Sequence, residues 1–383
     1  MLFSGIFPPI TTPFYADGAV YYKKLESNVE RYSRTPVAGI VVQGSTGEAI
    51  LLSDAERRDV LKVAIAAAAP HKVMIAGTGI ESAVETLRLT EYAAELGYDA
   101  AMVRTPHYYK KQMHPANLLA FYRTVADRSA LPIVIYNFPQ ATGYDMPAEL
   151  VTELANHPNI AAIKESSGNL EKVKVMVDGT RHIKRTATVT ETFAAVTPRM
   201  IKAAEAAAHA KQEKESRELV SVESLVGATN RTAPDSPAER DPDIPLRATS
   251  ATKPSSSAIS TIGNLKTRQK EVGFQILVGA AHQLEPSLAL GAAGAILAFA
   301  CPAPTTCYEI YAAIKEDDLP LAREKQERLK QAAQRVVSEL GVPGIKYAMD
   351  LNGYYGGPAR LPFLPLTGDQ KKVVEETMAN LRN

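Results

Sequence analysis

The chain has 383 residues, of which 45% are hydrophobic and 22% charged, and this composition is typical of a folded globular protein. The formal net charge of +1 gives no sign of a nucleic-acid partner or a membrane surface, and no apolar run reaches the roughly 18 residues of a membrane span. The two cysteines, Cys301 and Cys307, do not form a disulfide framework, so we expect a cytoplasmic protein.

Eight short apolar or β-branched runs recur along the chain, separated by stretches with helical periodicity. Such nearly continuous apolar runs are typical of parallel strands that are buried on both faces. Strands that alternate with helices in this number predict an α/β fold, a closed (β/α)₈ TIM barrel, with an open doubly wound sheet as the structural alternative. The predicted strands are 5–12, 39–43, 72–76, 100–104, 132–137, 160–164, 274–279 and 294–298.

One spacing interrupts this rhythm, because an unusually long stretch separates the sixth and seventh predicted strands. A charged helix is expected from Pro198 to about Val226, with Thr197 as its N-cap. The residues that follow are rich in proline and serine, and no aromatic residue occurs between Phe193 and Phe274, so this segment is expected to be mobile. We therefore divide the chain into a barrel (1–183 and 271–300), an insertion (184–270) and a C-terminal helical extension (301–383).

The sixth predicted strand ends in Lys164, and catalytic groups of barrel enzymes lie at the C-terminal ends of strands. Burial disfavours the charged ammonium and lowers its pKa, which would leave a nucleophilic amine able to form an imine with a ketone. The alternative is a structural lysine that extends to solvent or pairs with a nearby acid.

Three other predicted strands are also followed by, or end in, side chains that could take part in catalysis or substrate binding. Tyr136 ends the fifth strand and could carry a proton, although a tyrosine in this position is often structural. Ser45 and Thr46 lie in a glycine-containing turn after the second strand, where hydroxyl and N–H groups could hold a carboxylate. Tyr108 and Tyr109 follow the fourth strand, where a tyrosine pair is common as packing.

Taken together and in this order, these segments resemble the dihydrodipicolinate synthase / N-acetylneuraminate lyase family of class I aldolases. The resemblance covers residues 1–183 and 271–370 and depends on segments 44–48 and 136–143 and on Lys164. Within the family, segments 41–45, 76–79 and 353–358 look most similar to 4-hydroxy-2-oxoglutarate aldolases. The resemblance implies a barrel with a C-terminal helical extension, assembled as a homo-oligomer, a dimer or a tetramer built from tight dimers.

The resemblance also implies catalytic roles. Lys164 would be the Schiff-base lysine, and Tyr136 would move protons to and from the bound substrate. Ser45 would link Tyr136 to a second tyrosine that the family lends across the dimer interface. Tyr108 is the better match for that second tyrosine, and Tyr109 is its competitor because the length of this loop differs from that of the synthases.

Four further residues would contact the substrate if the resemblance holds. Thr46 and the backbone around it match the clamp for the pyruvate carboxylate. Ser166 matches a hydroxyl that contacts substrate in the hydroxy-oxoglutarate aldolases. Gly279 and Ile296 would offer backbone groups near the lysine. The mechanism implied uses neither a metal nor another cofactor, and its only partner besides other copies of the chain is a small 2-oxo acid.

One departure from the family pattern bears on the substrate. Members that make dihydrodipicolinate carry an arginine two residues after the proline of the tyrosine motif, and this chain has Ala141 there. We therefore expect cleavage of 4-hydroxy-2-oxoglutarate to pyruvate and glyoxylate. The alternatives are dihydrodipicolinate synthesis from pyruvate and aspartate semialdehyde, a sugar-acid lyase or dehydratase, and a non-enzymatic binding module.

Overall fold

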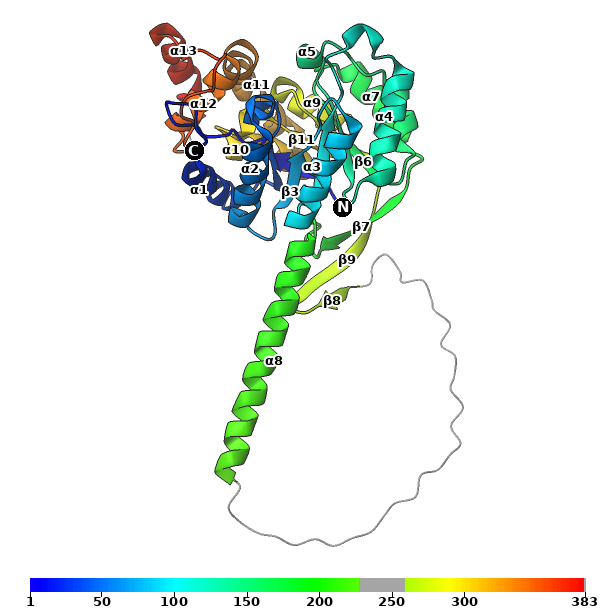
Figure 1. The fold of residues 1–383 in the computed structure, drawn as a ribbon, viewed down its shortest axis with the longest axis vertical. Helices are drawn as coiled ribbons and strands as arrows, with labels where there is room; N and C mark the ends of the chain where they lie inside the picture. Colours follow the sequence, from blue (N-terminus) through cyan, green and yellow to red (C-terminus); the bar gives the residue numbers. More distant parts are fainter. Residues whose placement is uncertain (227–258, 382–383) are drawn as a thin grey trace.

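The computed structural model describes residues 1–226 and 259–381, and the side chains of residues 1–110, 112–213 and 259–381 within them. Eight parallel strands form one sheet in the order β1-β11-β10-β6-β5-β4-β3-β2. Between β1 and β2 the backbone bonds Ile10 N–H to Val41 O (3.0 Å) and Ala38 N–H to Ile6 O (2.9 Å) close the sheet. The predicted TIM barrel is confirmed, and Figure 1 shows helices surrounding it.

The barrel strands are short and are joined by helices that cover their outer faces. Ser53 and Glu56 form a capping box at the start of the second helix. The barrel strands are β1 (Gly5–Phe7), β2 (Gly39–Val42), β3 (Val73–Gly77), β4 (Ala100–Arg104), β5 (Ile133–Asn137), β6 (Ile160–Glu165), β10 (Gln275–Val278) and β11 (Gly294–Ile296). The helices around them are α1 (Tyr22–Ser33), α2 (Asp54–Ala67), α3 (Ala83–Leu96), α4 (Pro115–Arg128), α5 (Pro139–Thr142), α6 (Ala148–Ala155), α7 (Leu170–Thr180) and α9 (Leu284–Ala289).

Two separate apolar clusters hold this arrangement together. One lies inside the barrel and includes Phe7, Val134, Ala162, Leu277 and Ile296. The other fills the layer between the strands and the helices. Because successive side chains of a strand point to opposite faces, each barrel strand contributes alternately to the two clusters. Both cysteines are buried and free.

The insertion between α7 and β10 leaves the barrel at the end opposite the C-terminal ends of the strands. Figure 1 shows its long helix α8 (Pro198–Val226) extending away from the barrel. Thr197 caps this helix by accepting a hydrogen bond from Met200 N–H (3.1 Å), and its own hydroxyl donates to Pro70 O (2.6 Å). Arg199 donates to the backbone carbonyl of Lys72. The first turn of α8 is therefore bound to the loop that precedes β3.

The insertion also contains strands that the sequence did not predict. Strands β7 (Arg185–Thr190), β8 (Ser260–Ile262) and β9 (Leu265–Val272) form an antiparallel sheet in the order β7-β9-β8. Leu2, which precedes β1, packs against Ala187 and Val189 of β7. Strands β8 and β9 occupy much of residues 259–270, where the sequence predicted a mobile segment and no strand. Residues 227–258, also expected to be mobile, lie outside the described residues.

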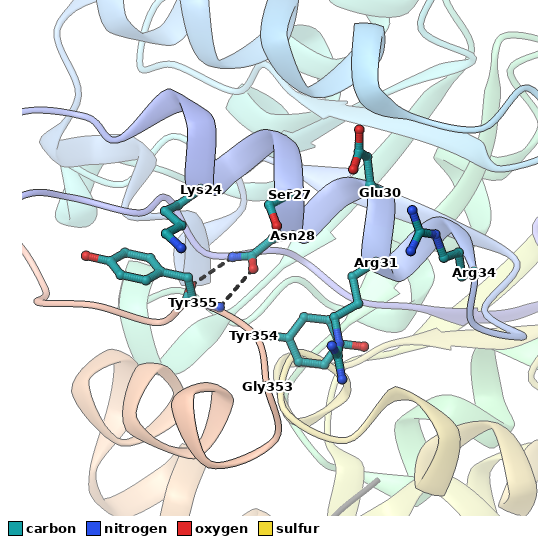
Figure 2. A pocket seen from close by; sticks show the side chains of 9 residues that line it. All are labelled: Lys24, Ser27, Asn28, Glu30, Arg31, Arg34, Gly353, Tyr354 and Tyr355. Atoms are coloured by element: carbon teal, nitrogen blue, oxygen red, sulfur yellow. Dashed lines mark hydrogen bonds between the residues drawn. The ribbon is translucent and has the colours of Figure 1, made fainter.

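The C-terminal extension consists of α10 (Pro304–Lys315), α11 (Leu319–Ala333), α12 (Gly341–Leu351) and α13 (Gly368–Met378), with a π-helical turn at Gln334–Glu339. It returns to α1, where Asn28 and Tyr355 exchange two hydrogen bonds of 2.8 and 2.9 Å. A hollow of about 320 Å³ lies beside this contact (Figure 2). It shares no lining residue with the strand-end groups predicted to carry chemistry.

Candidate active site

Lys164 lies near the C-terminal end of β6 and is 4% exposed. Ala162, two residues earlier on the same face of the strand, belongs to the cluster inside the barrel, so the side chain of Lys164 also points inward. Its register partners are Tyr136 on β5 and Leu277 on β10. The structure therefore places a buried amine at the mouth of the barrel and between two neighbouring strands.

The Lys164 amine lies directly over the ring of Tyr136, with Nζ 4.0 Å from the ring centroid. The hydroxyl of Tyr136 lies 3.3 Å from Ser45 Oγ, within hydrogen-bonding distance. Tyr136 is 4% exposed, whereas Ser45 is exposed at the mouth. The three groups expected to act together thus form a continuous line from the interior of the barrel to solvent, a geometry suited to proton transfer.

The turn that carries Ser45 is held in place from the far end of the chain. It forms a single 3₁₀ turn at Ser45–Gly47, and Glu48 follows it with the unusual φ of 55°. The Glu48 carboxylate pairs with Lys346 Nζ at 2.6 Å and accepts a hydrogen bond from Arg360 N–H at 2.7 Å. The Glu48 and Lys346 side chains are almost fully buried, so this ion pair fixes the turn to the C-terminal extension.

Thr46, expected in the carboxylate clamp, is 6% exposed in this turn. Ser166 follows β6, and Gly279 follows β10 beside it. A Cβ atom at Gly279 would lie only 1.9 Å from Ser166 Oγ, so the hydroxyl occupies the space that glycine leaves open. The Gly279 N–H donates to Glu165 O at 2.7 Å. Ile296 lies in the cluster inside the barrel.

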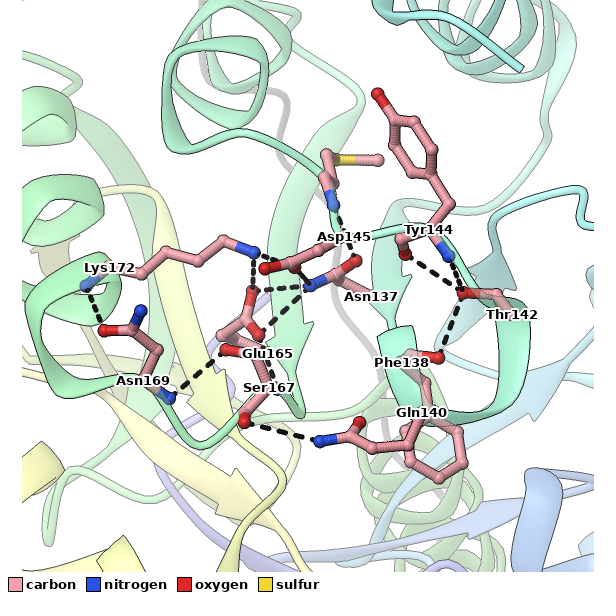
Figure 3. Close-up of polar contacts among 11 residues, drawn as sticks. Asn137, Phe138, Gln140, Thr142, Tyr144, Asp145, Glu165, Ser167, Asn169 and Lys172 are labelled. Carbon is pink, nitrogen blue, oxygen red and sulfur yellow. Dashed lines mark hydrogen bonds and ion pairs between the residues drawn. The ribbon is translucent and has the colours of Figure 1, made fainter. Parts of the chain in front are cut away.

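A cluster behind Lys164 and Tyr136 was not predicted from the sequence. Figure 3 shows Glu165 at its centre, surrounded by groups from β5, α7 and the loop after β6. Asn137 Nδ2 lies 3.1 and 3.0 Å from the two carboxylate oxygens, and Ser167 N–H donates to one of them at 2.7 Å. Lys172 Nζ lies 3.1 Å from Glu165 and also pairs with Asp145.

This cluster is the outward-facing counterpart of the candidate catalytic groups. Glu165 and Asn137 directly follow Lys164 and Tyr136, so their side chains point to the helical layer. Because Asn137 bridges the two strand ends, it fixes the distance between the amine and the phenol. The signal in the sequence was the pair of polar residues that each immediately follow a candidate catalytic residue.

The two tyrosines after β4 lie on the surface. Tyr108 is 76% exposed and Tyr109 is 62% exposed, and their rings pack edge to face with centroids 5.1 Å apart. Glu81 holds this loop by accepting hydrogen bonds from His107 N–H (2.8 Å) and Tyr108 N–H (3.1 Å). The structure of the single chain therefore does not join Tyr108 to the Lys164–Tyr136–Ser45 line, and in the described part of the chain its hydroxyl has no hydrogen-bond partner.

Comparison with known proteins identifies this arrangement. The model of the dihydrodipicolinate synthetase family matches residues 2–200 and 249–381. The chain belongs to the dihydrodipicolinate synthetase family. Members of this family are class I aldolases and lyases. The two matched ranges flank the part of the insertion that contains most of α8.

Curated relatives match about half of the chain. A protein named 4-hydroxy-tetrahydrodipicolinate synthase from Methanococcoides burtonii is 39% identical over 179 residues, 47% of this chain and 60% of that protein. A protein of the same name from Stenotrophomonas maltophilia is 41% identical over 177 residues, 46% of this chain and 59% of that protein. The chain thus matches about 60% of the length of these relatives. Because these relatives are named as synthases, the comparison does not show the expected similarity to 4-hydroxy-2-oxoglutarate aldolases in particular.

Solved structures share the fold over its whole length. Dihydrodipicolinate synthase DapA-2 from Bacillus anthracis superposes with a TM-score of 0.72 at 19% identity, covering 100% of both chains. YagE, a prophage protein of the same family from E. coli K12 in complex with pyruvate, gives a TM-score of 0.70 at 23% identity and covers 100% of this chain and 99% of its own. In residues 1–226 and 259–381, no helix is long and apolar enough to span a membrane.

Proposed function

We propose that the protein binds pyruvate as a Schiff base on Lys164 and joins it to, or releases it from, an aldehyde. The observation that carries this proposal is the line of three groups: a buried amine facing into the barrel mouth, 4.0 Å from the ring of Tyr136, whose hydroxyl lies 3.3 Å from Ser45. An amine is the nucleophile that carbonyl chemistry of this type requires, and a phenol beside it can carry the protons.

The reaction can be written with the residues present. Lys164 Nζ attacks C2 of pyruvate, and loss of water gives the iminium. Removal of a proton from C3, through Tyr136, gives the enamine, whose C3 attacks the aldehyde carbon. The new alkoxide takes a proton, and water then hydrolyses the iminium to free the product and Lys164. Cleavage follows the same steps in reverse.

The pyruvate carboxylate would lie against Thr46 and the N–H groups of the turn at Ser45–Gly47. A carboxylate that enters a largely buried site requires hydrogen bonds to replace its lost water. Ser166 and the Gly279 carbonyl, which lie together beside the end of β6, would contact the rest of the substrate. The position of each group at the mouth supports these roles.

The names of the relatives favour synthesis, the condensation of pyruvate with aspartate semialdehyde. We take this as the first candidate reaction. Ala141 favours the second candidate, cleavage of 4-hydroxy-2-oxoglutarate to pyruvate and glyoxylate, because α5 lacks the arginine expected in a synthase. Both reactions use the same enamine and an aldehyde that bears a carboxylate.

We further propose that the working enzyme is a homo-oligomer in which Tyr108 reaches the site of a neighbouring copy. Two observations support this arrangement: Tyr108 is exposed in the single chain, and Ser45 is exposed to solvent at the mouth of the barrel. A cytoplasmic location fits a metabolic enzyme of this type.

A product assay separates the two reactions. The enzyme would be incubated with pyruvate and aspartate semialdehyde, and separately with 4-hydroxy-2-oxoglutarate, with products followed by mass spectrometry. The first candidate predicts the cyclic condensation product, and the second predicts release of pyruvate and glyoxylate. If neither reaction occurs although pyruvate binds covalently, the acceptor is a different aldehyde.

A further inference from the structure

The loop after β5 has no cationic side chain at the position where a synthase is expected to carry an arginine. The acceptor aldehydes considered above bear a carboxylate, yet Ala141 on α5 is exposed and offers it neither a charge nor a hydrogen bond. The adjacent Gln140 turns its amide toward Ser167 O, at 3.4 Å, on the β6 side (Figure 3). If an acidic acceptor is used, its cation must come from another element.

The neighbouring loop provides one. Strand β4 pairs with β5, with Arg104 in register with Tyr136, so the loops that follow these two strands emerge side by side at the mouth. Lys110 lies in the β4 loop, in the 3₁₀ turn Lys110–Gln112, and its side chain extends across to Gly143, the residue that ends α5. A Cβ atom at Gly143 would lie 3.3 Å from Lys110 Cδ and 3.4 Å from Nζ. Lys110 thus approaches α5 two residues from Ala141.

The charge of Lys110 is free for a ligand. Among the residues whose side chains are described, its ammonium makes no hydrogen bond and no ion pair. Two nearby cations are already paired, since Arg104 lies 3.6 Å from Glu81 and Lys172 binds Glu165 and Asp145. An unpaired ammonium beside the site is a strong partner for a carboxylate that loses water on entry.

We propose that Lys110 binds the carboxylate of the acceptor aldehyde and thereby selects acidic acceptors, in place of an arginine at position 141. This inference rests on the proposed Schiff-base function. The competing explanation is that Lys110 only interacts with the negative end of α5, where helix carbonyl groups lack partners. The two explanations differ in whether the effect of the charge depends on the substrate.

The test compares acceptors that do and do not carry a carboxylate. Lys110→Met removes the ammonium and keeps most of the aliphatic chain, and Lys111→Met is the matched control at the next position. With aspartate semialdehyde, or with 4-hydroxy-2-oxoglutarate in the cleavage direction, we expect the KM of Lys110→Met to rise about tenfold or more, the scale of a lost charge-assisted hydrogen bond. The KM for pyruvate and the kinetics with an uncharged aldehyde such as acetaldehyde should stay unchanged.

A second variant tests the position of the charge. Ala141→Arg in the Lys110→Met background should restore the KM for the acidic acceptor and leave the uncharged acceptor unaffected. An equal loss with charged and uncharged acceptors, no change in KM, or the same effect from Lys111→Met would overturn the assignment. Absence of a borohydride-trapped pyruvate adduct in the parent enzyme would instead overturn the proposed function itself, so the two failures are distinguishable.

Discussion

The two ends of the barrel differ in what their polar side chains bind. At the end where the strands begin, cationic side chains are bonded to backbone carbonyls: Lys72 Nζ donates to Thr35 O and Val37 O, both at 2.7 Å, and Arg185 donates to Ile160 O at 2.6 Å. At the end where the strands finish, Lys164 and Ser45 face the mouth. In barrel enzymes generally, the first end contributes to stability and the second carries the chemistry.

The insertion attaches to one of these two ends of the barrel, the end opposite the mouth. Its described parts attach at the end where the strands begin, through Thr197, Arg199 and the contact of Leu2 with β7. The mouth is supported by buried clusters around Glu165 and Glu48, which bind backbone and side chains behind the reactive groups. Substitutions at the two ends should therefore have different consequences, which the following predictions test.

The largest effect is expected at Lys164. Lys164→Ala removes the nucleophile, so turnover should fall by several orders of magnitude because the covalent route is lost. Lys174→Ala is the matched control, since Lys174 pairs with Asp178 on the surface of α7. Steady-state assays of both variants, with circular dichroism to confirm folding, measure the difference. Retained turnover in Lys164→Ala would refute the role of this lysine.

A smaller loss is expected from the proton carrier. Tyr136→Phe keeps the ring under Lys164 and removes the hydroxyl, so kcat should fall about 10²–10⁴-fold, the scale of one positioned acid–base group. Ser45→Ala should cost less, because water can replace an exposed hydroxyl. Tyr98→Phe is the control from the other end of the barrel, where the hydroxyl donates only to Leu61 O (2.9 Å), and its kcat should not change. A silent Tyr136→Phe would make that tyrosine structural.

The buried pair behind the Ser45 turn should affect stability and substrate binding together. Lys346→Met leaves the Glu48 carboxylate buried without its partner and should cost roughly 3–5 kcal/mol of unfolding free energy. Because the turn then loses its support, the KM for pyruvate should also rise. Urea denaturation and pyruvate kinetics measure these effects. The double variant Glu48→Gln/Lys346→Met should be more stable than Lys346→Met alone, and the opposite order would contradict a paired role.

Shortening the insertion should change catalysis little. Replacing residues 191–264 with a short turn keeps β7 and β9 as a hairpin and removes α8, β8 and the residues between them. Kinetic constants should stay within a few-fold, since this segment attaches opposite the mouth, while solubility or assembly can change. The competing idea is that α8 reaches the active site of a neighbouring subunit. A shortened enzyme that keeps its assembly and its Lys164 adduct but loses turnover would favour that idea.

The smallest effect concerns pH. Hydrogen bonding to Arg360 lowers the pKa of Glu56 from 4.5 to about 2. A carboxylate with a lowered pKa stabilises the fold above its ordinary pKa, and this stabilisation is lost as pH falls from about 4.5 through about 2. Glu56→Gln should therefore cost at most about 1 kcal/mol near neutral pH, because the pair is partly exposed. The stability difference from the parent should shrink below pH 4.5 in acid titrations followed by circular dichroism.

The sequence predicted those features that depend on local pattern. Apolar runs located the eight barrel strands, and the position of Lys164 and Tyr136 at strand ends predicted that they would meet. The Glu48–Lys346 pair was not predicted, because it joins the two ends of the chain and neither residue belongs to a local motif. The β7–β9 sheet was missed because a strand made of threonine and charged residues carries no apolar signal, and its pairing is set by distant backbone. The proposed role of Tyr108 could not be tested in a single chain, because it requires a second copy.

The central claim is that Lys164 forms a Schiff base with pyruvate, and borohydride trapping tests it most directly. The parent enzyme, incubated with pyruvate and sodium borohydride and then digested, should yield a reduced pyruvate adduct on the peptide that contains Lys164. Lys164→Ala, treated in the same way, should yield none. An adduct of equal yield on the Ala variant, or no adduct on a folded parent enzyme at saturating pyruvate, would contradict the account.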